Sequence, residues 1–340
     1  MTFDLTLIEY VDVFWGMFVG IVQLEDIKNS SFDIYLSSFH KGGNQMRNET
    51  ILYETRDRLA IITLNRPEKF NTIRPPMPEE LEQAIAEANA DRDVRVIILQ
   101  GAGKAFCAGF DFSEDLEHFA QWGGQAGSET WDPGKDMMMV TSPFVGPVPK
   151  FMSIWRSPKP VIARVHGWCV GGGSDMALLC DVIVASEDAR FGTPYSRVWG
   201  CYLTGMWFFR LGLTKTKMLA LTGDSISGKE AAEMGLINKA VPADKLEEEV
   251  QYWAKRMAQC PTTQLAAMKL VVNQAFDNMG LMNTQLIGSI LDGYMRHTPE
   301  GMEFVRKSME KGVAAAIAER DAPFGDYSQG PPELKPKGTP

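Results

Sequence analysis

From Leu59 onward, short apolar runs alternate with amphipathic, helix-like stretches. The runs are rich in β-branched residues and are bounded by glycine or proline, which is typical of buried strands. We predict strands at Ala60–Leu64, Val94–Leu99, Val161–Val165 and Asp181–Ala185. A helix is predicted at Pro78–Ala90, because Leu81 and Ile85 share one face. This alternation favours repeated βα units around a parallel sheet.

Local signals predict two further helices. Ser227 and Glu230 form a capping-box pattern that opens a short helix, and Gly235 closes it. Another helix is predicted at Ser174–Leu179, directly after a glycine-rich turn. The stretch Trp122–Pro149 is rich in Gly, Pro and Met, and we interpret it as a long loop that borders the pocket.

The pattern changes after Pro242. Residues 244 to about 313 predict consecutive amphipathic helices, punctuated by Pro261, Gly280 and Pro299, and no strand. We expect the tail that starts at Ala322 to be disordered. The predicted organisation is an N-terminal extension at 1–48, an α/β core with the ligand site at 49–242, a helical region at 243–321 and the tail at 322–340.

The N-terminal extension differs in composition from the rest of the chain. Its apolar stretch, Val11–Val22, is shorter than the roughly 20 residues that cross a bilayer. Acidic residues precede this stretch, where a signal peptide would carry basic ones. The role of the extension is left open. The leading interpretation is a loosely attached segment, or one that an upstream start codon adds before Met46, and the alternative is a membrane-associating segment. No membrane partner is expected.

Composition narrows the class of protein. The chain has 340 residues, of which 45% are hydrophobic and 23% charged, and this is enough to bury a large core. Its net charge is −9, and no basic run interleaved with aromatics stands out, so a nucleic-acid partner is not expected. The five cysteines are odd in number and widely spaced, which favours reduced thiols in a cytoplasmic protein over a zinc site.

Two glycine-rich sequences resemble well-known motifs without matching them. The strand that ends in Gln100–Gly103 lacks the third glycine of the dinucleotide-binding fingerprint, because Phe106 occupies that position. The sequence Gly172–Met176 departs from the nucleophile elbow of serine hydrolases at its last residue. Neither a dinucleotide cofactor nor a serine nucleophile is favoured.

Two glycine-bearing turns remain, Ala105–Asp111 and His166–Asp175, and each follows a predicted strand. Each turn can present free backbone N–H groups, and the second turn runs into a predicted helix N-terminus. Two such donors can hold one carbonyl oxygen. They would stabilise the negative charge that a thioester carbonyl gains when its α-carbon is deprotonated or its β-carbon attacked. The alternative is that the glycines only allow a helix to pack closely on a strand.

Further motifs accompany these turns in a fixed order, namely Leu64–Asn71, Lys159–Ala163, Cys180–Asp181, Ala189–Pro194 and Leu221–Ile237. Together, over roughly Glu54 to Arg320, they resemble the crotonase superfamily, or enoyl-CoA hydratase/isomerase family. The resemblance implies an α/β fold, a crotonase-like spiral of ββα turns with a C-terminal helical oligomerisation region. It also implies a homotrimer or a dimer of trimers (a homohexamer). The implied substrate is an acyl-CoA thioester, with coenzyme A as part of the substrate and no metal or redox cofactor.

By position, the resemblance makes Ala108 and Gly172 the oxyanion-hole donors. It assigns substrate binding to Lys69, Phe70, Ala108, Gly109, Phe110, Asp111 and Gly172. The catalytic positions, which carry two glutamates in hydratases of this family, are occupied here by Asp175 and Tyr195. The Asp175 carboxylate is shorter by one methylene and retreats by on the order of 1 Å, and tyrosine is a poor base at pH 7 but a good hydrogen-bond donor.

Each of these two residues also has a plain alternative role. Asp175 can stabilise a helix N-terminus, and Tyr195 can be a wall of the acyl pocket. The leading function is an enoyl-CoA hydratase-like lyase of fatty acid metabolism. The alternatives are an enoyl-CoA isomerase, a C–C bond hydrolase on the same scaffold, or a non-catalytic CoA- or RNA-binding member of the family.

Overall fold

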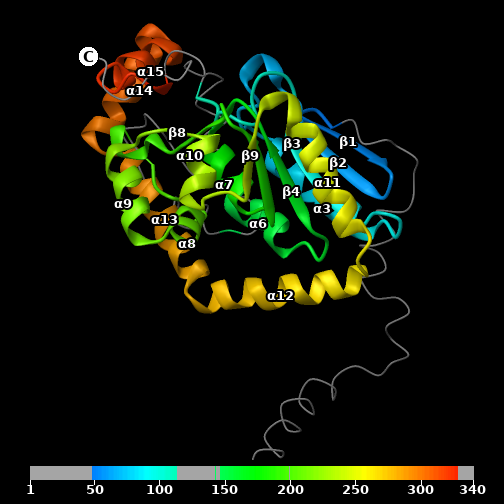
Figure 1. Cartoon of the computed structure of the whole chain (residues 1–340). Coiled ribbons are helices and arrows are strands. Elements are labelled where there is room, and N and C mark those ends of the chain that lie inside the picture. Colours follow the sequence, from blue (N-terminus) through cyan, green and yellow to red (C-terminus); the bar gives the residue numbers. More distant parts are fainter. Residues whose placement is uncertain (1–47, 113–141, 143–145, 199, 328–340) are drawn as a thin grey trace, which may run out of the picture. The chain divides into compact units, whose positions relative to one another are not determined.

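The computed structural model describes residues 48–112, 142, 146–198 and 200–327 (Figure 1). Three of the predicted segments lie wholly or mainly outside this range. They are the N-terminal extension apart from Asn48, the predicted loop at 122–149 apart from residues 142 and 146–149, and the tail from residue 328.

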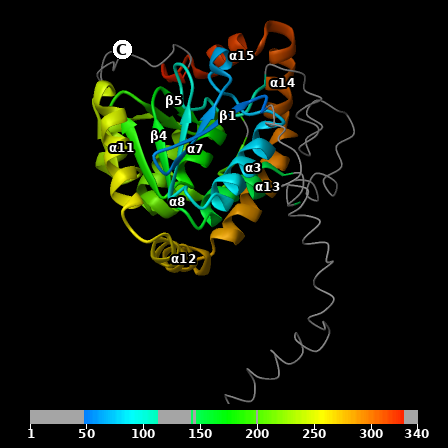
Figure 2. The same ribbon diagram turned by 90° about the vertical axis from the view of Figure 1, so that its right-hand side faces the viewer.

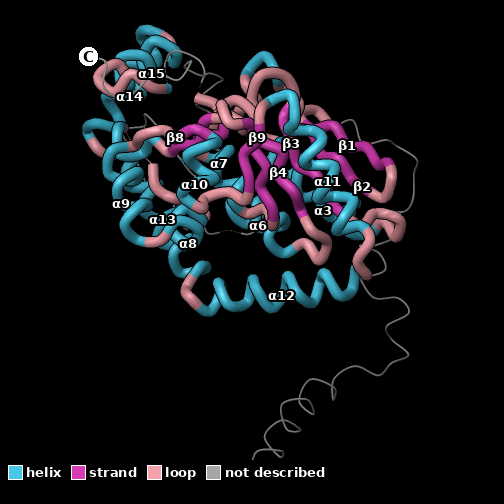
Figure 3. The backbone as a smooth tube through the Cα atoms, in the orientation of Figure 1, coloured by secondary structure: helices cyan, strands magenta, loops and turns pink. Residues whose placement is uncertain are grey.

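A six-stranded sheet forms the centre of the fold (Figure 3). Its strands lie in the order β1 (Ile51–Arg56), β2 (Leu59–Leu64), β3 (Val96–Gly101), β4 (Val161–Val165), β6 (Val182–Ser186) and β9 (Lys239–Val241). The first two strands form an antiparallel pair, and the other neighbours are parallel. The four predicted strands are confirmed to within two residues, whereas β1 and β9 were not predicted.

Side chains alternate along these strands between two apolar layers. In β2, Ala60 and Ile62 pack with α3 (Met77–Ala90) and α6 (Pro147–Arg156), whereas Leu59 and Ile61 pack with α11 (Leu246–Ala258). Figure 2 shows α3 and α11 on opposite sides of the strands. Both faces are therefore buried, which explains why the parallel strands read as continuous apolar runs.

A second, three-stranded sheet leads into the candidate site. It consists of β5 (Trp168–Val170), β7 (Arg190–Gly192) and β8 (Ile226–Ser227), in that order. The helix α7 (Gly172–Leu178) follows β5 and begins two residues earlier than predicted. A short 3₁₀ turn, η3 (Pro194–Arg197), follows β7 and carries Tyr195.

Helices make up most of the remaining described chain. Between η3 and β9 lie α8 (Met206–Leu211), α9 (Leu213–Thr222) and α10 (Gly228–Met234), and after α11 come α12 (Thr262–Asn278), α13 (Leu281–Arg296), α14 (Pro299–Lys311) and α15 (Val313–Asp321). The predicted breaks at Pro261, Gly280 and Pro299 each fall at a helix start. The Ser227–Glu230 capping box is confirmed, with Gly235 as the C-cap. Within the described ranges, no helix is both long and apolar enough to cross a bilayer.

Two predictions at the edges of segments need correction. The last residues of the predicted loop, Pro147–Pro149, form the first turn of α6, because proline fits a helix N-terminus. The structure also differs from the predicted disorder at its first residues, since Ala322–Tyr327 forms turns and Asp326 pairs with Arg197. No local pattern predicts this order, because these contacts join residues that are far apart along the chain.

Candidate active site

A cavity of about 460 Å³ forms where the two glycine-bearing turns meet, and its size is typical of a small-molecule site. Every residue that the sequence assigned to the oxyanion hole or to substrate binding lines this cavity: Lys69, Phe70, Ala108, Gly109, Phe110, Asp111 and Gly172. Tyr195 lines it as well. Further lining residues come from the C-terminal part of the chain and include Val313, Ile317 and Tyr327.

Asn71 fixes the first of these turns. The residue is fully buried, and its Oδ1 atom accepts a hydrogen bond of 2.8 Å from the Arg66 N–H. Its Nδ2 atom donates to the carbonyl oxygens of Ala102 and Ala105, both at 2.8 Å. Its φ of 55° is left-handed, a conformation that asparagine tolerates better than most residues. One side chain therefore ties the Leu64–Asn71 segment to the turn that carries Ala108.

The Ala108 N–H, a predicted oxyanion donor, already has a partner. It donates to the Phe70 carbonyl oxygen across 3.0 Å. The next residue, Gly109, has a φ of 97°, and a Cβ atom there would lie 3.0 Å from the Val170 carbonyl oxygen. The two turns consequently approach each other closely. A substrate carbonyl that binds Ala108 has to replace the Phe70 oxygen.

Gly172, the other predicted donor, is the first residue of α7, so its N–H has no partner within the helix. A Cβ atom at Gly172 would lie 2.7 Å from side-chain atoms of both Ile73 and Phe110. At Gly173, a Cβ atom would lie 2.3 Å from the Cys107 carbonyl oxygen. The glycines thus permit close packing of α7 on the first turn, and this packing brings Ala108 and Gly172 to the same cavity.

Asp175 and Tyr195 form a hydrogen-bonded pair. Asp175 is fully buried in α7, and its Oδ1 atom accepts from the Thr204 hydroxyl at 2.8 Å and from the Thr204 N–H at 3.3 Å. The Tyr195 hydroxyl donates to the Asp175 Oδ2 atom at 3.2 Å. Among the described residues that line the cavity, Tyr195 is present and Asp175 is not. Tyr195 is therefore the member of the pair that a ligand can touch.

Burial raises the pKa values of both groups but leaves the pKa of Asp175 well below that of Tyr195. Desolvation raises the pKa of Asp175 to about 6, although hydrogen bonds from Thr204 and Tyr195 oppose this rise. Desolvation, together with the nearby Asp175 charge, raises the pKa of Tyr195 well above its ordinary value. At neutral pH the phenol is protonated and the carboxylate is ionised. Asp175 is thus the base of the pair, and Tyr195 is the donor.

Asp111 has a structural partner. Its carboxylate forms an ion pair of 2.9 Å with Arg66 and accepts a hydrogen bond of 3.0 Å from the Thr72 hydroxyl. Both side chains of the ion pair are buried. The pair therefore joins the same two segments that Asn71 connects and keeps Asp111 at the cavity wall.

Sequence reasoning missed several residues of this site. Asn71 lies inside a motif that was recognised, and a polar residue within that motif was the available signal. Trp168 lies inside the recognised turn His166–Asp175, but its contact with Tyr327 could not be predicted from that turn. Thr204 and Tyr327 carry no local signal, because their roles come from contacts with distant parts of the chain. The described residues contain no group of three or more His, Cys, Asp and Glu side chains that could hold a metal ion. All five cysteines are free thiols, and Cys107, Cys169 and Cys180 are buried.

Comparison with known proteins places these observations in a family. A family model described as enoyl-CoA hydratase/isomerase matches residues 54–307. A probable enoyl-CoA hydratase of Mycobacterium bovis is 31% identical over 294 residues, which cover 82% of this chain and 99% of the relative. The 1,2-epoxyphenylacetyl-CoA isomerase of Escherichia coli is 28% identical over 281 residues, covering 81% of this chain and 98% of the relative.

Solved structures agree with the sequence comparisons. An enoyl-CoA hydratase structure from Mycobacterium smegmatis has 40% sequence identity and a TM-score of 0.76. The match covers 82% of this chain and 95% of that chain. The predicted α/β, crotonase-like fold class is therefore confirmed.

Proposed function

Because the chain belongs to the enoyl-CoA hydratase/isomerase family, we propose that it binds an acyl-coenzyme A and stabilises the enolate of its thioester. One observation carries this proposal. A single cavity is lined by the two predicted oxyanion donors and by a phenol that is hydrogen-bonded to a buried carboxylate. Coenzyme A is part of the substrate, and the chemistry needs no further cofactor.

In this proposal the Gly172 N–H is the first oxyanion donor and the Ala108 N–H is the second. The bond from Ala108 to the Phe70 oxygen joins two neutral groups, and such a bond contributes about 1 kcal/mol net. A bond to a charged oxygen is roughly twice as strong. Exchange of the Phe70 oxygen for the substrate oxygen therefore becomes most favourable as negative charge develops, which stabilises the transition state more than the ground state.

Tyr195 and Asp175 would move the proton. When the substrate α-carbon loses a proton to the Tyr195 oxygen, the phenol passes its own proton to Asp175. The reverse transfer returns a proton to carbon, so that the pair ends in its starting state. The hydrogen bond of 3.2 Å between the two side chains supports this relay.

Hydration of an enoyl-CoA is the leading reaction, as the names of most of the relatives above suggest. Double-bond isomerisation is the second candidate, and a specific observation favours it. Hydration needs one group to activate water and one to protonate carbon, whereas only Tyr195 of the pair lines the cavity. Isomerisation removes a proton from one carbon and returns it to another, which one relay can serve.

Incubation with a panel of acyl-CoAs in deuterated water tests the proposal. Deuterium at the α-carbon, detected by mass, is the expected result and reports enolate formation even without net turnover. Gain of one water identifies hydration, and migration of the double bond without such a gain identifies isomerisation. Binding of acyl-CoA with neither exchange nor turnover would contradict the catalytic proposal and favour a non-catalytic member of the family.

We extend the proposal to assembly as a homotrimer or dimer of trimers in the cytoplasm. Large apolar side chains on α12 and α13 are exposed in the single chain, among them Leu270, Val271, Val272 and Ile287. Figure 1 shows α12 at the margin of the described chain. Burial of these side chains between copies would remove apolar surface from water, and this supports an oligomer.

A further inference from the structure

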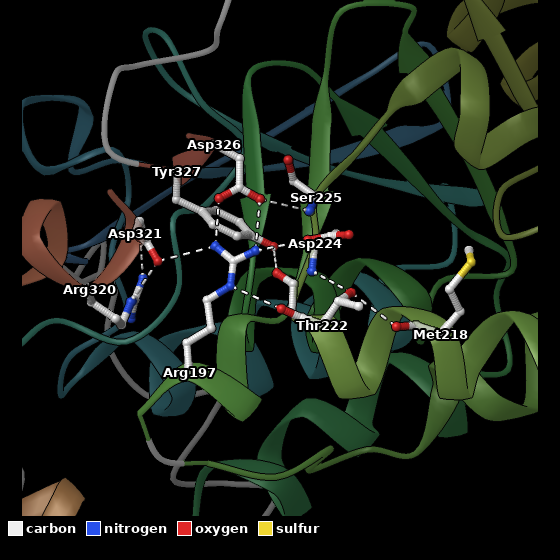
Figure 4. Close-up of polar contacts among 10 residues, drawn as sticks. Arg197, Met218, Thr222, Asp224, Ser225, Arg320, Asp321, Asp326 and Tyr327 are labelled. Atoms are coloured by element: carbon white, nitrogen blue, oxygen red, sulfur yellow. Dashed lines mark hydrogen bonds and ion pairs between the residues drawn. The ribbon is translucent and has the colours of Figure 1, made fainter. Parts of the chain in front are cut away.

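A buried arginine holds the end of the described chain in place. The Arg197 side chain is 2% exposed, and its guanidinium forms a two-point ion pair with Asp326. The Nη1 atom lies 2.5 Å from Asp326 Oδ1, and the Nη2 atom lies 3.1 Å from Asp326 Oδ2 (Figure 4). The Nη1 atom also donates to the fully buried Asp321 across 3.3 Å. We call the segment Asp321–Tyr327 the C-terminal strap.

The same guanidinium binds the end of α9 and the residues that follow it. Its Nε atom donates to the Thr222 carbonyl oxygen at 3.1 Å, and its Nη2 atom donates to Asp224 at 3.1 Å. The Phe324 ring of the strap lies against the guanidinium face, 3.8 Å from Cζ to the ring centroid. Arginine can make all of these contacts at once because its donors form a rigid planar fork, whereas lysine has a single ammonium group.

Tyr327 brings the strap to the cavity. Its ring lines the cavity and stacks on Trp168, with centroids 6.0 Å apart and planes inclined by 26°. Its hydroxyl donates to the Gly223 carbonyl oxygen at 3.0 Å. Tyr327 is thus fixed on one side by an aromatic ring and at its tip by a hydrogen bond.

Gly192 leaves the space that the Tyr327 hydroxyl occupies. A Cβ atom built on Gly192 would lie only 1.8 Å from the Tyr327 Oη atom and 2.7 Å from Cζ. Gly192 lies in strand β7 and is not among the glycines with a positive φ. Its backbone would therefore accept alanine, and Tyr327 is the reason why a side chain does not fit.

The strap and the candidate catalytic phenol depend on one element. Tyr195 and Arg197 both belong to the short turn η3, and Tyr195 and Tyr327 line the same cavity. The position of Tyr327 therefore fixes how much room the cavity has beside Trp168. Apolar neighbours from α15, Val313 and Ile317, continue this wall.

We propose that Tyr327 is a specificity-determining residue, which limits the size of the acyl group accepted on the Trp168 side of the cavity. Arg197 is a positioning residue that holds Tyr327 there through Asp326. This inference rests on the proposed acyl-CoA function. One methylene in an apolar pocket changes selectivity by about 10- to 200-fold, so removal of a whole phenol ring is expected to give a large shift.

The first test compares Tyr327→Ala with the wild type across a series of acyl-CoAs of increasing bulk. The preference for bulky over small acyl groups, measured as the ratio of their kcat/KM values, is expected to rise at least about tenfold. Tyr252→Ala, at an exposed tyrosine on α11, is the matched control and is expected to leave the ratio unchanged. Tyr327→Phe keeps the ring and is expected to retain most of the wild-type selectivity.

A second set of variants is designed to displace the Tyr327 side chain without replacing that residue. Gly192→Ala is expected to shift selectivity in the same direction, and Gly192→Ala combined with Tyr327→Ala to shift it no further than Tyr327→Ala alone. Arg197→Lys is expected to produce a partial shift with a higher KM, while Arg306→Lys, at an exposed arginine on α14, has no effect.

These experiments distinguish failure of the proposed function from failure of the inference about Tyr327. If titration shows that the wild type binds no acyl-CoA, the proposed function fails. If acyl-CoAs bind and react but Tyr327→Ala leaves the size preference unchanged, this inference fails alone. Additive shifts in the Gly192 and Tyr327 double variant would also overturn it, because the two changes would then act through different contacts. Far-UV circular dichroism and the thermal midpoint show whether each variant is folded.

Discussion

At the scale of single residues, the Tyr195 phenol and the Asp175 carboxylate share a hydrogen bond of 3.2 Å, but only the phenol lines the cavity. The aspartate side chain was expected to withdraw its carboxylate by the length of one methylene. In addition, the Asp175 carboxylate lies behind the Tyr195 phenol and does not line the cavity. A ligand meets a neutral donor, and the negative charge lies behind it. This arrangement makes the two residues interdependent, because the carboxylate can exchange protons with the ligand through the phenol.

The relative effects of two conservative substitutions follow from this dependence. Asp175→Asn is expected to nearly abolish α-proton exchange while acyl-CoA binding persists, because the amide cannot accept a proton. Tyr195→Phe is expected to be severe as well, with a loss of about 10²-fold or more in exchange, since it removes the group that lines the cavity. Deuterium uptake measured for both variants and for the double variant checks this. If the two losses multiply in the double variant, the residues do not act as one relay.

The raised pKa of Asp175 also predicts a pH dependence of stability. The folded protein holds the Asp175 proton up to about pH 6, whereas the unfolded chain loses it near the ordinary value of 3.8. Between these limits the unfolded state binds fewer protons, so the free energy of unfolding falls as pH rises. About two pKa units correspond to a loss of about 3 kcal/mol, completed near pH 6.

Urea denaturation of the wild type and of Asp175→Asn at several pH values measures this effect. The difference in free energy of unfolding between the two proteins is expected to favour the wild type most at about pH 4 and to decline up to about pH 6. Tyr195 stays protonated throughout this range, so its titration does not obscure the result. A difference that is independent of pH would contradict the raised pKa.

At the scale of elements, Asn71 is the residue on which the first glycine-bearing turn most depends. Asn71→Ala removes three hydrogen bonds, two of them buried and one partly buried, and leaves the Arg66 N–H and two carbonyl groups without this partner. Since an unsatisfied buried polar group costs about 1–3 kcal/mol, we expect a destabilisation of at least about 2 kcal/mol. Chemical denaturation checks it, with Asn278→Ala on α12, where the side-chain partner is exposed, as the control. A loss equal to that of the control would show that Asn71 does not hold the turn.

The elements differ in how far the sequence could predict them. The strands β2, β3, β4 and β6 are buried on both faces, so their apolar runs are long enough to recognise. By contrast, β5, β7, β8 and β9 have two or three residues each, which is too short for any periodicity. The edge strand β1 buries only Ile51 fully and shows no clear alternation.

Some features of the candidate site could be predicted from the sequence, and others could not. The turns that carry Ala108 and Gly172 need glycine at particular positions, and these glycines can be recognised in the sequence. The exclusion of Asp175 from the cavity lining and the bond from Ala108 to Phe70 depend on packing. The cavity wall made by Tyr327 depends on the ion pair between Arg197 and Asp326. These two residues lie more than a hundred residues apart, so no local sequence pattern predicts their contact.

At the scale of the whole molecule, the exposed apolar side chains of α12 and α13 need a physical explanation. On α12, Leu270 is 67% exposed and Val271 is 66% exposed, while on α13, Ile287 is 57% exposed. Each large aliphatic side chain that passes from water to a dry interface contributes about 1.5–3 kcal/mol at full burial. A few such side chains from each copy are enough to favour association, provided that the surfaces are complementary.

We therefore expect the wild type to be a trimer or a hexamer by light scattering at micromolar concentration. Val271→Glu, which places a charge on this surface, is expected to shift the population towards smaller species, because burial of an unpaired carboxylate is costly. The control Lys245→Glu changes charge at an exposed site before α11 and is expected to leave the assembly intact. Within the single chain, the glycine-bearing turns and the strap both line the cavity. Acyl-CoA binding by a dissociated variant would then persist, whereas a loss of binding on dissociation would show that a neighbouring copy completes the site.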